Sequence, residues 1–96
     1  MSAPAPWQNL GAFLYEARHR AALTQYHVAH QLGITQAAYS QIERGLIRPR
    51  PALLLPLAVL LGLGLGQLAA LAGYPLEQLT FADRSKKDAS IRRRVT

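Results

Sequence analysis

Apolar residues recur at helical spacing along most of the chain, and short polar or glycine-containing breaks separate the periodic segments. The pattern predicts helices at about residues 10–20, 25–32, 36–44, 51–61 and 65–72, with one more turn at 76–79. Residues 1–8 contain two prolines that block an early helix, so they should form an unstructured lead-in. We therefore expect an all-α fold, a compact bundle of about five short helices.

Residue types that begin and end helices stand at the limits of the predicted segments. Thr24 and Thr35 precede the second and third segments, and each hydroxyl can accept a backbone N–H as an N-cap. Asn9 holds the corresponding place before the first segment. Gly33 and Gly45 follow the second and third segments, where only glycine takes a left-handed conformation without strain. The middle of the chain is therefore expected to form two short helices joined by a tight turn.

The same periodicity separates side chains expected in the core from those expected at the surface. The inward positions of the first three helices are Leu10, Leu14, Ala17, Ala21, Val28, Ala29, Leu32, Ile34, Tyr39 and Ile42. Gln36, Ala37, Ser40 and Gln41 lie off the apolar stripe of their segment and should point outward. The third helix is thus predicted to present a small face of amide, hydroxyl and methyl groups.

The stretch from residue 51 to residue 74 is almost entirely apolar, and Gln67 is its only strongly polar side chain. A run of this length is the usual sign of a membrane span, but Gly62, Gly64, Gly66 and the internal Pro56 are too many for one span. We expect instead two helices that are apolar nearly all round, more than so small a core can cover. Exposed apolar surface marks contact sites, so we predict a homodimer, or a complex with another protein, through residues 51–72.

Two prolines and one tryptophan carry further expectations about local structure. Pro51 suits a first helical turn, but Pro56 removes a hydrogen bond inside the fourth helix and should either kink the helix or delay its start. Trp7 is too large to be left in water by preference and is expected to cap the core.

The chain has 96 residues, enough for one domain, and a formal net charge of +6. Residues 1–82 hold five arginines against three glutamates, a net charge of +2, and residues 83–96 hold six basic against two acidic side chains, a net charge of +4. This contrast divides the chain into a domain at 1–82 and a basic tail at 83–96. A basic balance favours an anionic partner, nucleic acid first. The tail is either a disordered arm that contacts phosphates or a solubilising extension.

Other chemistries find little support in the sequence. The absence of cysteine excludes disulfides and thiolate metal sites, and His19, His27 and His30 lack a converging acidic ligand, so no metal site is expected. There is no phosphate-binding glycine loop and no serine with a neighbouring His–acid pattern, so we predict neither an enzyme nor a cofactor. The N-terminus shows no positive region followed by an apolar one, which predicts a cytoplasmic protein.

The region from about residue 10 to residue 72 resembles the helix-turn-helix domain of the phage-repressor (Xre/Cro/CI-type) family. The residues that carry the resemblance are Leu23, Thr24, Gln25, Val28, Ala29, Leu32, Gly33, Ile34, Thr35, the run Ser-Gln-Ile-Glu-Arg-Gly at 40–45, and Pro49, continued by Leu57, Ala58, Leu61 and Gly62. A spaced pattern over so many positions is far more specific than a single short motif.

The resemblance implies a lambda-repressor-like fold whose recognition helix, residues 36–44, lies in the DNA major groove. It also implies a partly buried ion pair between Arg18 and Glu43, and a Gln25 that steadies the DNA backbone and supports the first residue of the recognition helix. Tyr39 departs from the family, which carries a branched aliphatic residue there. Its ring should either shift the recognition helix outward or bring its hydroxyl to the surface.

The expected DNA-binding residues divide by the part of the DNA that suits their chemistry. Gln36 is the first candidate for reading a base, because its amide both donates and accepts and can pair with the adenine edge. Ser40 and Gln41 share this face, and the Ala37 methyl can touch a thymine methyl. The residues expected near phosphates are Thr24, Gln25, Thr35, Arg44, Arg48 and Arg50.

Together these patterns predict a sequence-specific regulator of transcription that binds double-stranded DNA, with repression as the expected direction. The alternative is an antitoxin or adaptor whose apolar fourth and fifth helices bind a protein partner. An adaptor would bind DNA only secondarily.

Overall fold

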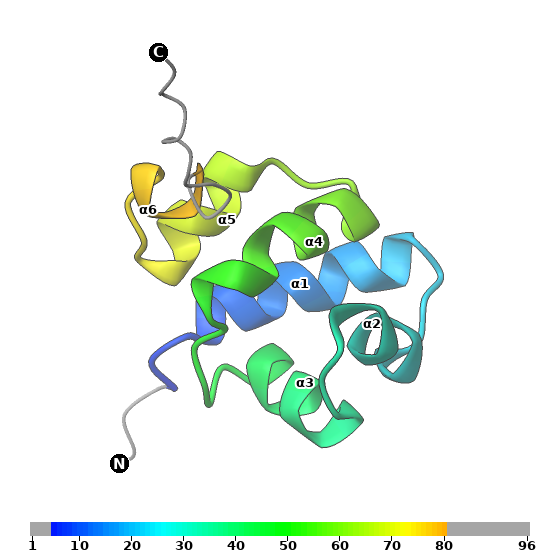
Figure 1. The fold of residues 1–96 in the computed structure, drawn as a ribbon. Helices are drawn as coiled ribbons and strands as arrows, with labels where there is room; N and C mark the ends of the chain where they lie inside the picture. The colour runs from blue at the N-terminus through cyan, green and yellow to red at the C-terminus, as the bar shows by residue number, and fades with distance from the viewer. Residues whose placement is uncertain (1–4, 81–96) are drawn as a thin grey trace.

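A computed structural model describes residues 5–80 of the chain. Within this range the fold is all-α, as predicted, and its elements are α1 (Gln8–Arg20), α2 (Gln25–Leu32), α3 (Gln36–Glu43), α4 (Pro51–Leu61), α5 (Leu65–Ala72) and the single turn α6 (Glu77–Thr80). Helix α4 crosses the middle of the bundle in front of α1, with α2 and α3 at one end and α5 and α6 at the other (Figure 1). The recognition-helix candidate α3 therefore lies at the edge of the molecule, away from α5 and α6.

The predicted caps delimit α2 and α3. The Thr24 hydroxyl accepts the His27 backbone N–H, and the Thr35 hydroxyl accepts the Ala38 backbone N–H, each at 3.0 Å. Gly33 ends α2 in the left-handed conformation with φ 72°. These signals depend only on near neighbours in the sequence, so they could be predicted without knowledge of the tertiary structure.

The start of α1 differs from the prediction. Asn9 is not the N-cap, because the helix already begins at Gln8 and no side chain caps it. Instead the Trp7 backbone N–H donates to the Gly45 carbonyl at 3.1 Å, and the Trp7 carbonyl accepts from Gly11 at 2.9 Å. A contact between distant segments therefore fixes where α1 begins and places Asn9 within its first turn.

The end of α1 also has a feature that the sequence did not suggest. Ala22 follows the helix with φ 58°, a left-handed conformation that costs a residue with a Cβ roughly 1–2 kcal/mol. The Leu23 backbone N–H reaches back to the Arg18 carbonyl at 3.1 Å and closes this turn. The turn redirects the chain from α1 into α2.

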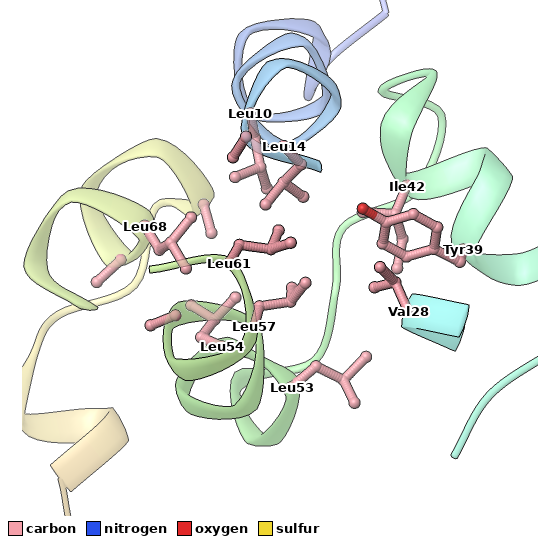
Figure 2. Packing of buried hydrophobic residues seen from close by; sticks show 14 of the residues in the cluster. Leu10, Leu14, Val28, Tyr39, Ile42, Leu53, Leu54, Leu57, Leu61 and Leu68 are labelled. Carbon is pink, nitrogen blue, oxygen red and sulfur yellow. The ribbon is translucent and has the colours of Figure 1, made fainter. Parts of the chain in front are cut away.

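The core lies between α4, α1 and the α2–α3 pair. Figure 2 shows Leu54, Leu57 and Leu61 of α4 in one cluster with Leu14 of α1 and Leu68 of α5. Apolar side chains from all five longer helices are buried in this one cluster. Five residues of α4 (Leu53, Leu54, Leu57, Ala58 and Leu61) are buried in the core, so its central position explains much of the leucine-rich sequence.

Tyr39 is completely buried, and its ring lies beside Val28 and Ile42 (Figure 2). Of the two outcomes expected for Tyr39, the one in which its hydroxyl reaches the surface is wrong, because that oxygen is buried and has no hydrogen-bond partner among residues 5–80. Burial and the neighbouring Glu43 carboxylate raise the pKa of Tyr39 well above its ordinary value. The ring is accommodated within the core, with its oxygen on the side toward Leu14 of α1 (Figure 2).

Helix α4 runs without interruption from Pro51 to Leu61, so Pro56 does not delay its start. Pro51 occupies the first turn, where its missing N–H costs nothing. Pro56 is exposed, and the carbonyl that loses its partner belongs to the exposed Ala52, which water can reach. An internal proline is therefore tolerated on the solvent side of the helix.

The predicted excess of apolar surface on α4 and α5 is smaller than expected. Each helix buries one face, but Leu55 and Val59 on the outer side of α4 remain 56% and 76% exposed. Among residues 5–80, no helix has the length and apolar character needed to cross a bilayer. Within α4 and α5, the exposed large apolar side chains thus form a short strip on α4.

Candidate nucleic-acid interface

Helix α3 has one buried face and one open face. Tyr39 and Ile42 point into the core, whereas Gln36, Ala37 and Gln41 are exposed. Ser40 is half-buried between the two faces. The outward-pointing group expected from the sequence is therefore brought together on a short, well-anchored helix at the edge of the bundle (Figure 1).

The starts of α2 and α3 carry the two exposed threonines. Each hydroxyl is engaged by a backbone N–H of its own helix, which leaves the other first-turn N–H groups available to an anion. The side chains of Thr24 and Thr35 remain exposed. Neither helix has an acidic residue in its first turn that would repel a phosphate.

An ion pair joins α1 to the end of α3. The Arg18 guanidinium donates from Nε to Glu43 Oε2 at 2.6 Å and from a terminal nitrogen to Oε1 at 3.1 Å, and both residues are buried. A third donor of Arg18 reaches the Leu23 carbonyl at 2.8 Å. Two parallel hydrogen bonds fix the relative orientation of the two groups, which a single charge contact would not.

Gln25 completes this buried network. Its amide nitrogen donates to Glu43 Oε1 at 3.0 Å, so α2 as well as α1 holds the end of α3. Burial alone would raise the pKa of the Glu43 carboxyl, but hydrogen bonds from Arg18 and Gln25 outweigh burial and hold that pKa below its ordinary value. The hydrogen bond with Glu43 raises the pKa of Arg18. Gln25 therefore supports the last residue of α3, whereas the family resemblance had suggested support for its first.

The three arginines around the α3–α4 loop do not share one environment. Arg44 and Arg50 stand at the two ends of the loop and are exposed. Arg48 donates from Nε to the Ala72 carbonyl at 2.7 Å and from a terminal nitrogen to the Gly73 carbonyl at 2.8 Å. Its guanidinium is thus engaged within the molecule although the residue is exposed, and its expected phosphate contact stays a prediction.

His19 and His30 lie beside tyrosines on the outer surface of α1 and α2. His19 is 4.2 Å from the Tyr15 ring, and His30 is stacked 6.0 Å from the Tyr26 ring, measured between ring centroids. Within the described part of the chain, no three potential metal-ligating side chains of His, Cys, Asp or Glu gather at one place. These histidines belong to aromatic surface pairs.

Sequence reasoning missed the contacts made by Gly11 and by Trp7. A Cβ at Gly11 would collide with the backbone of Glu43, so this glycine lets α1 and α3 approach closely. A glycine inside a predicted helix was the available signal for such an approach. The basic tail at 83–96 lies outside the described residues, so its expected phosphate contacts stay a prediction.

Comparison with known proteins agrees with this geometry. Residues 9–73 match a family model described as "Helix-turn-helix domain". The match covers more than half of the chain and includes α2, α3 and the turn between them. No curated protein and no solved structure gives a significant match.

Proposed function

The chain belongs to the helix-turn-helix domain family, and from this premise we propose that it is a transcriptional repressor of the Xre/Cro/CI type. In this proposal α3 enters the major groove of double-stranded DNA in the cytoplasm. The observation that supports it best is the open face of α3, where amide and hydroxyl groups stand on a helix anchored by a buried ion pair. Rigid presentation is what selective base contacts require.

The proposed roles follow from position and chemistry. Gln36, at the start of α3, reads a base edge through its amide, and Ser40 and Gln41 extend the contact by one turn. Ala37 offers a methyl group to a thymine. These groups determine sequence preference, because only base edges differ from one site to another.

The phosphate contacts are assigned to a separate set of groups. The exposed starts of α2 and α3, at Thr24 and Thr35, provide backbone N–H groups, and Gln25 lies in the first turn of α2. Arg44 and Arg50 provide positive charge on either side of the loop. Such contacts fix affinity and register without discriminating between sequences.

Replacing Gln36 with alanine is expected to relax preference at one base position and leave the others unchanged, because one bidentate amide contact is lost. Discrimination at that position should fall by about 1–3 kcal/mol. Selection from a random DNA pool, followed by binding titrations on single-base variants of the selected site, measures this loss. Gln67→Ala, which removes an exposed amide from α5, is the matched control and should preserve the full preference.

Arg50→Ala provides the contrasting result in the same titrations. It should weaken binding to every sequence alike and reduce the slope of log K against log salt by about 0.9, the effect of one lost phosphate contact on duplex DNA. If Gln36→Ala and Arg50→Ala both weakened all sequences equally, the assignment of Gln36 to base reading would be wrong.

The exposed strip on α4 supports a second part of the proposal, a homodimer through the leucine-rich region 51–72. Leu55 and Val59 are one helical turn apart and exposed. No charged side chain occurs between Pro51 and Tyr74, so two positively charged copies would meet there without direct repulsion. A two-fold dimer would place two copies of α3 about 34 Å apart, one turn of DNA.

Val59→Lys is expected to convert the dimer to a monomer, because pairing would bury two unpaired charges at the two-fold contact. Light scattering coupled to size-exclusion chromatography at tens of micromolar measures the molar mass. Ala12→Lys, on the exposed side of α1 and outside region 51–72, is the control and should remain dimeric. A monomeric wild-type protein at this concentration would refute the homodimer.

An antitoxin or adaptor is the second candidate function. A shallow apolar groove between α2 and α4 favours it, with Gln31, Leu32, Leu55, Pro56, Val59 and Leu60 along its walls. A monomeric wild-type chain that co-purifies with one other protein, and loses that protein on Val59→Lys, would support this function over the homodimer.

A further inference from the structure

Arg48 is the centre of a cluster that joins three distant segments of the chain. Its guanidinium lies 3.7 Å from the centroid of the Tyr74 ring and 5.0 Å from that of the Trp7 ring. Two of its nitrogens donate to the Ala72 and Gly73 carbonyls at the end of α5. We call this group of five residues, Trp7, Arg48, Ala72, Gly73 and Tyr74, the Arg48 clasp.

The clasp satisfies the polar groups that a helix end leaves open. The last carbonyls of α5 have no partner within their own helix and carry partial negative charge. A planar guanidinium can donate to two of them at once while its faces contact aromatic rings. A lysine ammonium cannot reproduce that combination, because it is a compact charge without a flat face.

The same cluster holds the loop between α3 and α4 at successive points. The Trp7 backbone N–H donates to the Gly45 carbonyl at 3.1 Å, and the Tyr74 hydroxyl donates to the Pro49 carbonyl at 2.8 Å. Gly45 has φ 76°, and a Cβ there would meet the backbone of Gln8. Figure 1 shows the N-terminal segment running beside this loop. The loop is therefore tied to α1 at its start and to the segment after α5 at its end.

Arg44 and Arg50 immediately flank the stretch that the clasp immobilises. Arg44 is the C-cap residue of α3 and Arg50 is the N-cap residue of α4, so the path of the loop sets the distance and direction between them. All three arginines are exposed, and the Arg48 guanidinium is turned toward the end of α5. Long exposed side chains lose less entropy on binding when their backbone is already fixed.

We propose that Arg48 is a positioning residue for DNA binding: through the clasp it fixes the α3–α4 loop so that Arg44 and Arg50 meet phosphates together. The inference rests on the proposed function and deepens it. It assigns to Arg48 a role through other residues, in place of a phosphate contact of its own. It also assigns Trp7 and Tyr74, which lie outside the helix-turn-helix pair, to the support of the DNA-binding surface.

The test is a double-mutant cycle for DNA binding with Arg48→Lys and Arg50→Ala. All four proteins are titrated on one selected site, at a temperature where circular dichroism shows each to be fully folded. In the wild-type background Arg50→Ala should weaken binding about tenfold or more, the value of one charge-assisted hydrogen bond. In the Arg48→Lys background the same change should cost less than about threefold, because Arg50 is no longer held in place.

Tyr74→Leu is a second, independent variant for this test, because it disrupts the Arg48 clasp without replacing any arginine. It removes the stacking surface and the hydrogen bond to Pro49, so it should reduce the Arg50→Ala penalty in the same way. Loss of fold alone cannot give this result, since the comparison is made among folded proteins. If Arg48 and Tyr74 only stabilised the fold, Arg50→Ala would reduce DNA affinity by the same factor in every background.

Two results would overturn the inference. One is wild-type affinity for Arg48→Lys, which would show that the charge of Arg48 matters and its clasp does not. The other is an equal Arg50→Ala penalty in all three backgrounds. Failure of the proposed function itself is distinct, because the wild-type chain would then select no DNA sequence from a random pool.

Discussion

Gly11→Ala is expected to destabilise the protein by about 3 kcal/mol or more and to abolish DNA binding at temperatures where the wild-type chain is folded. The added methyl would overlap the Glu43 carbonyl and come within 2.9 Å of the Ile42 carbonyl. These are backbone atoms near the end of α3, so no side-chain rotation relieves the clash. Helices α1 and α3 would have to separate. Chemical denaturation followed by circular dichroism measures the free energy of unfolding.

Gly66→Ala is the matched control for this prediction. Gly66 is also inside a helix, but no atom lies within 4 Å of the place its Cβ would take. Removing glycine flexibility from an open helical position should raise the free energy of unfolding by roughly 0.5–1 kcal/mol. If the free energy of unfolding falls in Gly11→Ala and rises in Gly66→Ala, the loss at Gly11 comes from close packing and not from helix propensity. Equal changes in the two variants would contradict the argument for Gly11.

The limits and caps of α2 and α3 could be predicted because the information lies within a few residues. A threonine before an apolar stripe and a glycine after it satisfy the open ends of a helix wherever that helix sits. Periodicity likewise separates the buried Tyr39 and Ile42 from the exposed Gln36 and Gln41. The polar face of α3 was therefore predictable in composition from the sequence alone.

Features that depend on distant segments could not be obtained from local patterns. The start of α1 is set by a hydrogen bond from Trp7 to Gly45, which is 38 positions away, so the local signal at Asn9 was misleading. Arg48 looked like a phosphate ligand because its neighbours are basic, yet the end of α5 and two aromatic rings engage it. The leucine-rich run looked uncovered because the central place of α4 could not be foreseen.

Arg18→Met is expected to destabilise the protein by about 3–5 kcal/mol at pH 7, because it leaves the Glu43 carboxylate buried without its counter-charge. Methionine approximates the length of the arginine stem, so the loss reports mainly on the charge. Arg20→Met removes an exposed arginine two positions away and should change the free energy of unfolding by less than about 0.5 kcal/mol. Denaturation of both variants gives the comparison.

The pH dependence of stability should reverse its sign in Arg18→Met. In the wild-type protein the folded-state pKa of Glu43 is below its ordinary value of 4.5, so its contribution is present above pH 4.5 and is lost as the pH falls through the folded-state pKa. Without Arg18, burial is the largest remaining influence and raises that pKa. The variant should therefore gain stability as the pH falls from 7 toward 4.5. A variant that instead loses stability over this range would show that Gln25 alone keeps Glu43 ionised.

The double variant Arg18→Met with Glu43→Met distinguishes the effect of the ion pair on the stability of the fold from its effect on the orientation of α3. Replacing both charges with apolar side chains should restore much of the lost free energy of unfolding, because no buried charge remains. DNA affinity should stay weaker than that of the wild-type protein, since the bidentate contact that orients the end of α3 is absent. If the double variant bound its selected site with wild-type affinity, packing alone would orient α3. The ion pair would then contribute nothing to presenting Gln36, Ser40 and Gln41 to the DNA.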